Sequence, residues 1–313
     1  MLSHQPGISR AATRFSVLMP GFFLRAALSV LVASTASALC ADDRNARPLP
    51  EPRAFLDEVR KNLRSDDTLL EQYTFTEKRT EKRLDASGAV KRVKSETYEV
   101  YPSAEPGQMY RRLVARDDVP IPAKELAAED QKQQQRTELS EKKRAEEDDT
   151  ARARRLQKEE EEEREERAVV DEVFRMDDIR VEGRETLNGR PTIVISFQPK
   201  PGYRPVTTGA RVIQKLAGKA WVDEEDRQLA RVEARLIDTL GVGPARLARL
   251  QKGAVSYFYR RKVNDEIWLP AEARFTGSAK VLWLFGARVD AFFQYSDYRK
   301  FSVSTDSAVD TTQ

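Results

Sequence analysis

The chain has 313 residues, with 54 lysines and arginines against 51 aspartates and glutamates. Three of the basic residues, Arg10, Arg14 and Arg25, precede position 39, so the rest of the chain carries 51 groups of each sign. This balance argues against a nucleic-acid-binding protein, in which basic groups are in excess. The only histidine is His4 and the only cysteine is Cys40. A mature chain that begins near position 39 therefore excludes Ser-His-Asp and Cys-His catalysis, histidine-ligated metals and a disulfide framework.

The first 38 residues have the pattern of a secretory signal peptide. The three arginines form a positive region, an uncharged run follows over residues 26–41, and Ala36-Ser37-Ala38 offers a small-residue cleavage site. The run is shorter than the roughly 20 residues that a spanning helix needs. We therefore expect export to the periplasm, with a retained membrane anchor as the alternative. A lipid anchor at Cys40 is disfavoured, because Leu39 stands where lipidation requires a small side chain.

The mature chain is expected to start with a disordered, proline-containing lead-in over residues 39–50 and one amphipathic helix over residues 51–70. The apolar period then changes to two, which is typical of strands. Ser87-Gly88 marks a hairpin turn within this part of the chain. The expected strands begin near Tyr73, at Val90 and at Met109.

A charged insertion over residues 122–175 interrupts this pattern. Between Glu129 and Arg167, 26 of 39 residues are charged and none is glycine or proline. Residues of opposite charge recur four apart, which favours a helix. Leu139 and Leu156 are too far apart for a heptad seam, so the helix is expected to be solvent-exposed. It is either a projecting arm for a partner or a tolerated insertion in a loop.

Strand patterns resume after Val169. Asn188-Gly189 predicts a tight hairpin turn, and the return strand over residues 229–237 alternates between apolar and charged side chains. Short helices are expected over 210–216 and 246–250, and a loose tail over 304–313. The other expected strands cover residues 179–186, 191–197, 218–223, 255–263, 267–276 and 280–298.

These elements predict a mainly β (α+β) protein, with about ten strands in one curved antiparallel sheet that forms a half-open barrel around helices. The barrel domain would cover residues 51–303, apart from the charged insertion.

Several stretches resemble those of the lipoprotein-carrier superfamily, which includes the outer-membrane lipoprotein-sorting proteins of the periplasm. They are Gly218-Lys219-Ala220-Trp221-Val222-Asp223, Leu229-Ala230-Arg231-Val232-Glu233, Gly253, Glu266-Ile267-Trp268-Leu269-Pro270 and the closing run from Tyr295 to Phe301. The resemblance implies a curved half-barrel that binds a lipid or a lipidated protein. The charged insertion departs from the family pattern, as do the basic positions Arg260, Arg261 and Lys262, expected on the outer face. Fold alone does not establish carrier function.

The candidate ligand-binding residues form the apolar, inward-facing set of the expected strands. This face lines either a core that the helices fill or a cavity for an acyl chain, which gains about 0.8 kcal/mol per buried methylene. Its members are Tyr73, Phe75, Ile193, Ile195, Phe197, Val232, Ala234, Leu236, Leu269 and Phe275.

Two further groups are interpreted as structural. The four carboxylates from Asp223 to Asp226 lie at a hairpin turn, where a shared exposed environment would give no separated acid and base. The tryptophans Trp221, Trp268 and Trp283 are expected to pack on strands, with Trp268 on the face opposite Leu269. We expect no catalytic residue, no metal site and no cofactor.

The sequence therefore predicts a periplasmic, non-enzymatic binding protein that carries a lipid or lipidated partner in an apolar concavity. The alternative is an envelope sensor or interaction scaffold with a filled barrel, which contacts another envelope protein through residues 129–167. Neither function requires nucleic acid or a stable membrane span.

Overall fold

The computed structural model describes residues 47–63, 70, 72–85, 87–103, 109–242, 248–281 and 285–300. The expected signal peptide, Cys40, Trp283 and the tail over 304–313 lie outside these residues. None of the helices in the described part of the chain is both long and apolar enough to cross a membrane.

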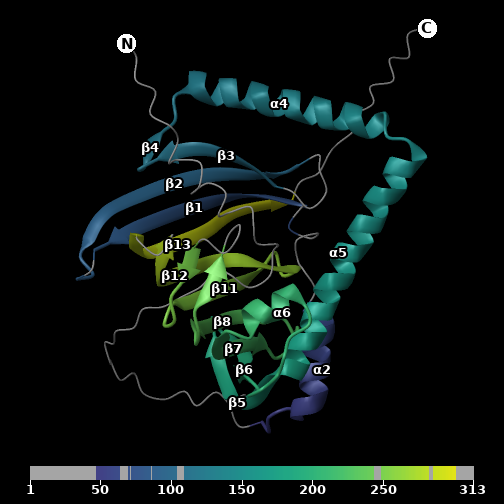
Figure 1. The fold of residues 1–313 in the computed structure, drawn as a ribbon, viewed down its shortest axis with the longest axis vertical. Helices are drawn as coiled ribbons and strands as arrows, with labels where there is room; N and C mark the ends of the chain where they lie inside the picture. Colours follow the sequence, from purple (N-terminus) through teal and green to yellow (C-terminus); the bar gives the residue numbers. More distant parts are fainter. Residues whose placement is uncertain are drawn as a thin grey trace.

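The strands form one antiparallel sheet in the order β4-β3-β2-β1-β13-β12-β11-β8-β7-β6-β5, so β4 and β5 are its two edges. Short strands β9 and β10 pair with each other, and β10 also pairs with β12. Figure 1 shows the sheet curving without closing, as the sequence predicted. In chain order the strands are β1 (Tyr73–Leu84), β2 (Val90–Pro102), β3 (Met109–Arg116), β4 (Val119–Pro120), β5 (Asp177–Leu187), β6 (Arg190–Pro199), β7 (Leu216–Asp223), β8 (Leu229–Leu236), β9 (Leu240–Val242), β10 (Ala248–Leu250), β11 (Val255–Val263), β12 (Ile267–Val281) and β13 (Phe285–Lys300).

Four helices complete the described fold: α2 (Pro52–Asn62), α4 (Ala123–Ala145), α5 (Asp149–Met176) and α6 (Thr208–Ile213). The start of α2 is defined by its cap, because the Glu51 carboxylate accepts hydrogen bonds from the backbone N–H groups of Arg53 and Ala54 at 3.0 and 2.6 Å. These bonds lower the pKa of Glu51. Pro52 suits the first helical position because its missing N–H has no partner there.

The structure corrects several sequence predictions. The sheet has thirteen strands rather than about ten. Helix α2 ends at Asn62 rather than at residue 70, and residues 64–69 lie outside the described part. Residues 248–250 form strand β10 instead of a helical turn, because they pair with β9 and β12. The boundary between the last two strands also moves, since β12 continues to Val281 before β13 begins at Phe285.

Other predictions are confirmed. At the β5–β6 turn, Asn188 and Gly189 both have positive φ, 49° and 78°, as the two central residues of a type I′ hairpin require. In β8, the residues Val232, Ala234 and Leu236 are buried, while Arg235 between them is exposed. The charged insertion is helical, and both Leu139 and Leu156 are exposed.

Helices α4 and α5 connect the two edges of the sheet, since α4 follows β4 and α5 leads directly into β5 (Figure 1). Near the β4 edge, Arg112 of β3 holds Asp130 of α4 with two hydrogen bonds of 2.7 and 2.8 Å. At the other end, the apolar last turns of α5 pack against α6 through Val169 and Met176. We call residues 123–176 the helical strap, because it is attached to the sheet at both ends.

Candidate ligand-binding surfaces

All ten residues of the expected inward face are buried or half-buried, and the structure divides them among three hydrophobic clusters. Most belong to the largest cluster, on β6, β8 and the middle of β12, where Ile193 is fully buried and Leu236 is 2% exposed. Phe75 belongs to a second cluster, on β1, β2 and β13. Tyr73 and Leu269 form a third with Ile267. The first cluster holds Ile193, Ile195, Val232, Ala234 and Leu236, with Phe197 and Phe275 packed against it.

Helix α2 covers the first cluster. Phe55 and Val59, one helical turn apart, are 2% and 1% exposed and belong to the same cluster as the strand residues. Phe174 of α5 packs against it as well. Full burial of such side chains contributes roughly 1.5–3 kcal/mol each. This part of the inward face is therefore a core that the helices fill.

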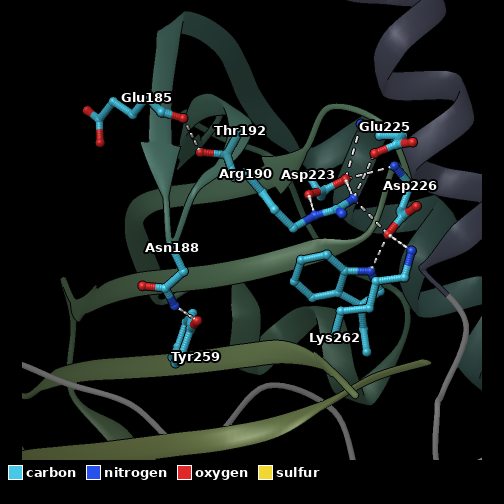
Figure 2. A network of polar contacts seen from close by, with 10 residues as sticks. Glu185, Asn188, Arg190, Thr192, Asp223, Glu225, Asp226, Tyr259 and Lys262 are labelled. Carbon is cyan, nitrogen blue, oxygen red and sulfur yellow. Dashed lines mark hydrogen bonds and ion pairs between the residues drawn. The ribbon is translucent and has the colours of Figure 1, made fainter. Parts of the chain in front are cut away.

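The acidic turn between β7 and β8 is not the uniformly solvated turn that the sequence predicted. Asp223 is fully buried, whereas the side chain of Glu225 is 77% exposed. The cause is Arg190 at the start of β6, which reaches over the turn and binds both oxygens of Asp223, at 2.6 and 2.9 Å. Figure 2 shows the Arg190 side chain lying among the acidic residues. Burial of Asp223 is possible because its charge is paired.

Asp226 joins this network to β11 and β12. Its Oδ2 atom accepts a hydrogen bond from the indole Nε1 of Trp268 at 2.8 Å and forms ion pairs with Lys262 at 2.9 Å and Arg190 at 3.1 Å. Burial alone would raise the pKa of Asp226, but these contacts outweigh it and the pKa is lowered. The guanidinium of Arg190 also lies 5.6 Å from the Trp268 ring centre. Trp268 is thus on the face opposite Leu269, as predicted, and there it contacts both Asp226 and Arg190.

A pocket of about 250 Å³ opens beside this network. In the view of Figure 2, Asn188 and Tyr259 lie to one side of Arg190 and the acidic turn lies to the other. Arg261 and Lys262 were predicted as basic outer positions, but the pocket itself was not predictable from the sequence, since its walls come from separate hairpins. The lining residues are Leu187, Asn188, Arg190, Ala230, Tyr259, Arg261, Lys262, Asp265 and Trp268.

One basic position of this region was placed wrongly. Arg260, expected on the outer face, is only 7% exposed, and it donates hydrogen bonds to the carbonyl oxygens of Leu229 and Trp268 at 3.2 and 2.6 Å. Burial lowers the pKa of its guanidinium to about 10. The register of β11 and β12 shifts beside Arg260, between Tyr259 and Arg260. Such a bulge changes which side chains point outward, and the alternation rule cannot anticipate it.

A group that sequence reasoning missed is Asp177, where α5 ends and β5 begins. Its side chain is 3% exposed, and neither carboxylate oxygen has a hydrogen-bond partner among the described residues. Desolvation raises its pKa to about 6, against the opposing charge of Lys200. Five residues earlier, the buried Glu172 accepts hydrogen bonds from the backbone N–H groups of Val206 and Thr207 at 2.6 and 2.8 Å. The end of the helical strap is thus held by Glu172, whose carboxylate is hydrogen-bonded, and is followed by Asp177, whose buried carboxylate has no hydrogen-bond partner among the described residues.

No family model and no curated protein matches the chain. Among the solved structures that the chain resembles, three are matched over most of their lengths. They are a DUF1329 family protein from Desulfovibrio piger (13% identity, 79% of this chain and 92% of that one, TM-score 0.31), a putative outer membrane lipoprotein-sorting protein domain from Vibrio parahaemolyticus (10%, 79% and 90%, 0.27) and a LolA superfamily protein from Nitrosomonas europaea (11%, 80% and 94%, 0.24).

One of these structures is a putative lipoprotein-sorting protein domain, and the sequence resembles the lipoprotein-carrier superfamily. Similarity at this level says nothing of function. The fold class rests on the strand order of the sheet itself, which is antiparallel and open.

Proposed function

We propose that the protein is an exported, non-enzymatic binding protein whose half-barrel is a packed scaffold. The observation that carries this proposal is the packing of α2 on the sheet, since Phe55 and Val59 belong to the same buried cluster as Ile193 and Leu236. An acyl chain enters this region only if α2 leaves it. Burial of the apolar strand residues is thereby accounted for without a ligand.

The partner would then bind to an outer surface of the protein. The surface we propose is formed by residues 129–167 of the helical strap. Over this stretch α4 and α5 present charged side chains to solvent, several of them in ion pairs four residues apart, such as Arg155–Glu159 at 3.1 Å and Lys158–Glu162 at 3.5 Å. Such pairs contribute only a few tenths of a kcal/mol each. We expect the partner to be a second envelope protein whose charged side chains pair with the charged side chains of both signs on this surface. The signal-peptide pattern of residues 1–38 supports a periplasmic location.

A second candidate, transport of a lipid or lipidated protein, is favoured by one observation. The aromatic rings of Phe197, Phe258 and Phe275 remain partly exposed on or beside the buried clusters of the inward face. Partly exposed apolar side chains of this kind can line the entrance to an acyl site. The two functions differ in whether the cluster under α2 has room for a ligand.

The test is the variant Ala234→Trp. Ala234 is 6% exposed and lies within the cluster that α2 covers. In a filled core the added ring should lower the free energy of unfolding by about 1–3 kcal/mol, and the wild type should bind no fatty-acyl fluorescent probe. Arg235→Trp is the matched control, because it adds the same ring at the exposed neighbouring position of β8. Probe binding by the wild type, lost in Ala234→Trp without a change in melting, would establish the carrier function instead.

A further inference from the structure

The pocket beside the acidic turn has an arrangement of charge that points to a ligand. Three of its lining residues are cations, Arg190, Arg261 and Lys262, and one is a carboxylate, Asp265. The cations come from β6 and β11, two strands far apart in the sequence. The neighbouring carboxylates Asp223 and Asp226 are not part of the lining. The walls of the pocket therefore carry more positive than negative groups.

The carboxylates next to the pocket are already engaged by groups of the protein. Both oxygens of Asp223 are occupied by Arg190, and Oδ1 also accepts the backbone N–H groups of Glu225 and Asp226 at 3.1 and 2.8 Å. Asp226 Oδ2 already serves Arg190, Lys262 and Trp268. Asp223 and the Oδ2 atom of Asp226 are therefore already engaged by groups of the protein, and both carboxylates neutralise part of the positive charge.

Arg261 is the pocket cation that has no direct ion pair among the described residues, although its charge contributes to the lowered pKa of Asp297 on β13. It is exposed, it lines the pocket, and it forms no ion pair within 4 Å in the part of the chain that the structure describes. A guanidinium offers five N–H donors in a planar fork that matches the oxygens of phosphate and carboxylate groups. Lys262, the next residue, adds an ammonium group that shares its one carboxylate, Asp226, with Arg190.

The rest of the pocket adds aromatic and amide groups. Tyr259 and Trp268 line it, together with Ala230 and with Asn188 of the β5–β6 turn. At about 250 Å³ the pocket is slightly smaller than sites for drug-sized ligands, which begin near 300 Å³. It suits a single acidic group attached to a small body. The two neighbouring cations of β11, Arg261 and Lys262, offer N–H donors to the charged oxygens of a phosphate group.

We propose that this pocket binds a phosphate monoester or diester, with Arg261 and Lys262 as the residues that hold the phosphate and with Tyr259 beside the attached group. The inference goes beyond the proposed scaffold function and does not depend on whether the inward face is filled. The phosphate belongs either to a soluble small molecule or to a lipid headgroup, and the two sources share the same recognition chemistry.

The test measures binding of phenyl phosphate to the full mature chain by isothermal titration calorimetry. Arg261→Gln should weaken binding by about tenfold or more, because it removes a hydrogen-bonded charge pair. Asp265→Asn should strengthen binding by about threefold, since it removes the one carboxylate of the lining, and Asn is tolerated at its positive φ of 54°. Arg235→Gln, which removes the same charge from an exposed position on β8 outside the pocket lining, should bind like the wild type.

A second arm distinguishes the two sources of phosphate. Sedimentation with vesicles of phosphatidylcholine containing phosphatidylglycerol should be lost in Arg261→Gln if the ligand is a headgroup, and should be absent already in the wild type if the ligand is soluble.

The proposal is overturned if phenyl phosphate and vesicles both fail to bind, if Arg261→Gln binds like the wild type, or if Arg235→Gln weakens binding as much. It is also overturned if Asp265→Asn weakens binding, the result expected for a neutral sugar or a zwitterion. Melting curves of each variant separate loss of binding from loss of fold, and Asp265→Asn decides the matter if Arg261→Gln does not fold.

Discussion

Arg190 and Asp223, which lie 33 residues apart on β6 and β7, form an ion pair in which two guanidinium nitrogens bind the two oxygens of a fully buried carboxylate. This pair orders the acidic hairpin turn beside the pocket that Arg190 lines. Removing one partner of such a pair leaves a buried charge without compensation.

We therefore expect Arg190→Ala to lower the free energy of unfolding by about 3 kcal/mol, because Asp223 would lose its countercharge. The comparison is Glu225→Gln, which removes an exposed partner of the same arginine and should cost less than about 0.5 kcal/mol. Urea denaturation of both variants measures the two values. If both variants lost the same free energy of unfolding, the burial of Asp223 would contribute nothing to the effect of Arg190→Ala.

Asp177 predicts a pH dependence of stability. Its pKa is about 6 in the folded chain, against 3.8 for an unperturbed carboxyl group, so folding favours the protonated form. The penalty is absent below about pH 4, grows between about pH 4 and pH 6, and stays constant above this range. At pH 7.5 the shift of roughly two units corresponds to about 3 kcal/mol.

Asp177→Asn should therefore stabilise the protein at pH 7.5 by up to about 3 kcal/mol and have little effect at pH 3.5. Urea denaturation at the two pH values measures the difference. Asp178→Asn is the control, because the neighbouring carboxylate is more exposed and its pKa is lowered by a hydrogen bond from Arg180. If Asp177→Asn raised the free energy of unfolding equally at both pH values, the effect could not come from the buried charge of Asp177.

Gly218 on β7 is required by close backbone packing. A Cβ atom there would lie 1.9 Å from the carbonyl oxygen of Glu233 on β8, and this atom cannot move without the strand. We expect Gly218→Ala to reduce stability by about 3 kcal/mol or more, since strand separation is the only relief. Gly183→Ala on β5 should be neutral within about 0.5 kcal/mol, because nothing lies within 4 Å of its added Cβ. Thermal melting of Gly218→Ala and Gly183→Ala measures the difference. An unchanged melting temperature of Gly218→Ala would mean that β7 and β8 separate easily at this position.

The middle of the helical strap is expected to be dispensable for folding. Replacing residues 131–166 by a Gly/Ser segment of equal length removes almost no buried apolar area, as the exposure of Leu139 (69%) and Leu156 (44%) shows. The thermal midpoint should stay within a few degrees of the wild type. The anchors Asp130 and Val169 remain in this variant. A collapse of stability or solubility would show that the strap packs on the body along its whole length, whereas loss of partner binding alone would support the proposed interaction surface.

Those features that depend on neighbouring residues were predictable from the sequence. The alternation of Val232, Arg235 and Leu236 along β8, and the Asn188-Gly189 turn, follow from local periodicity and from the φ angles that Asn and Gly tolerate. The charged helices were predictable as well, because they lack both helix-breaking residues and an apolar seam.

Pairing between distant segments was decided only by the tertiary structure. Asp223 is buried because Arg190 comes from another strand, and Arg260 is buried because of a register shift between β11 and β12. The division of the inward face into three clusters depends on where α2 lies. None of these contacts leaves a periodic trace in the sequence, since burial of a charged side chain depends on a partner that the chain brings close only on folding.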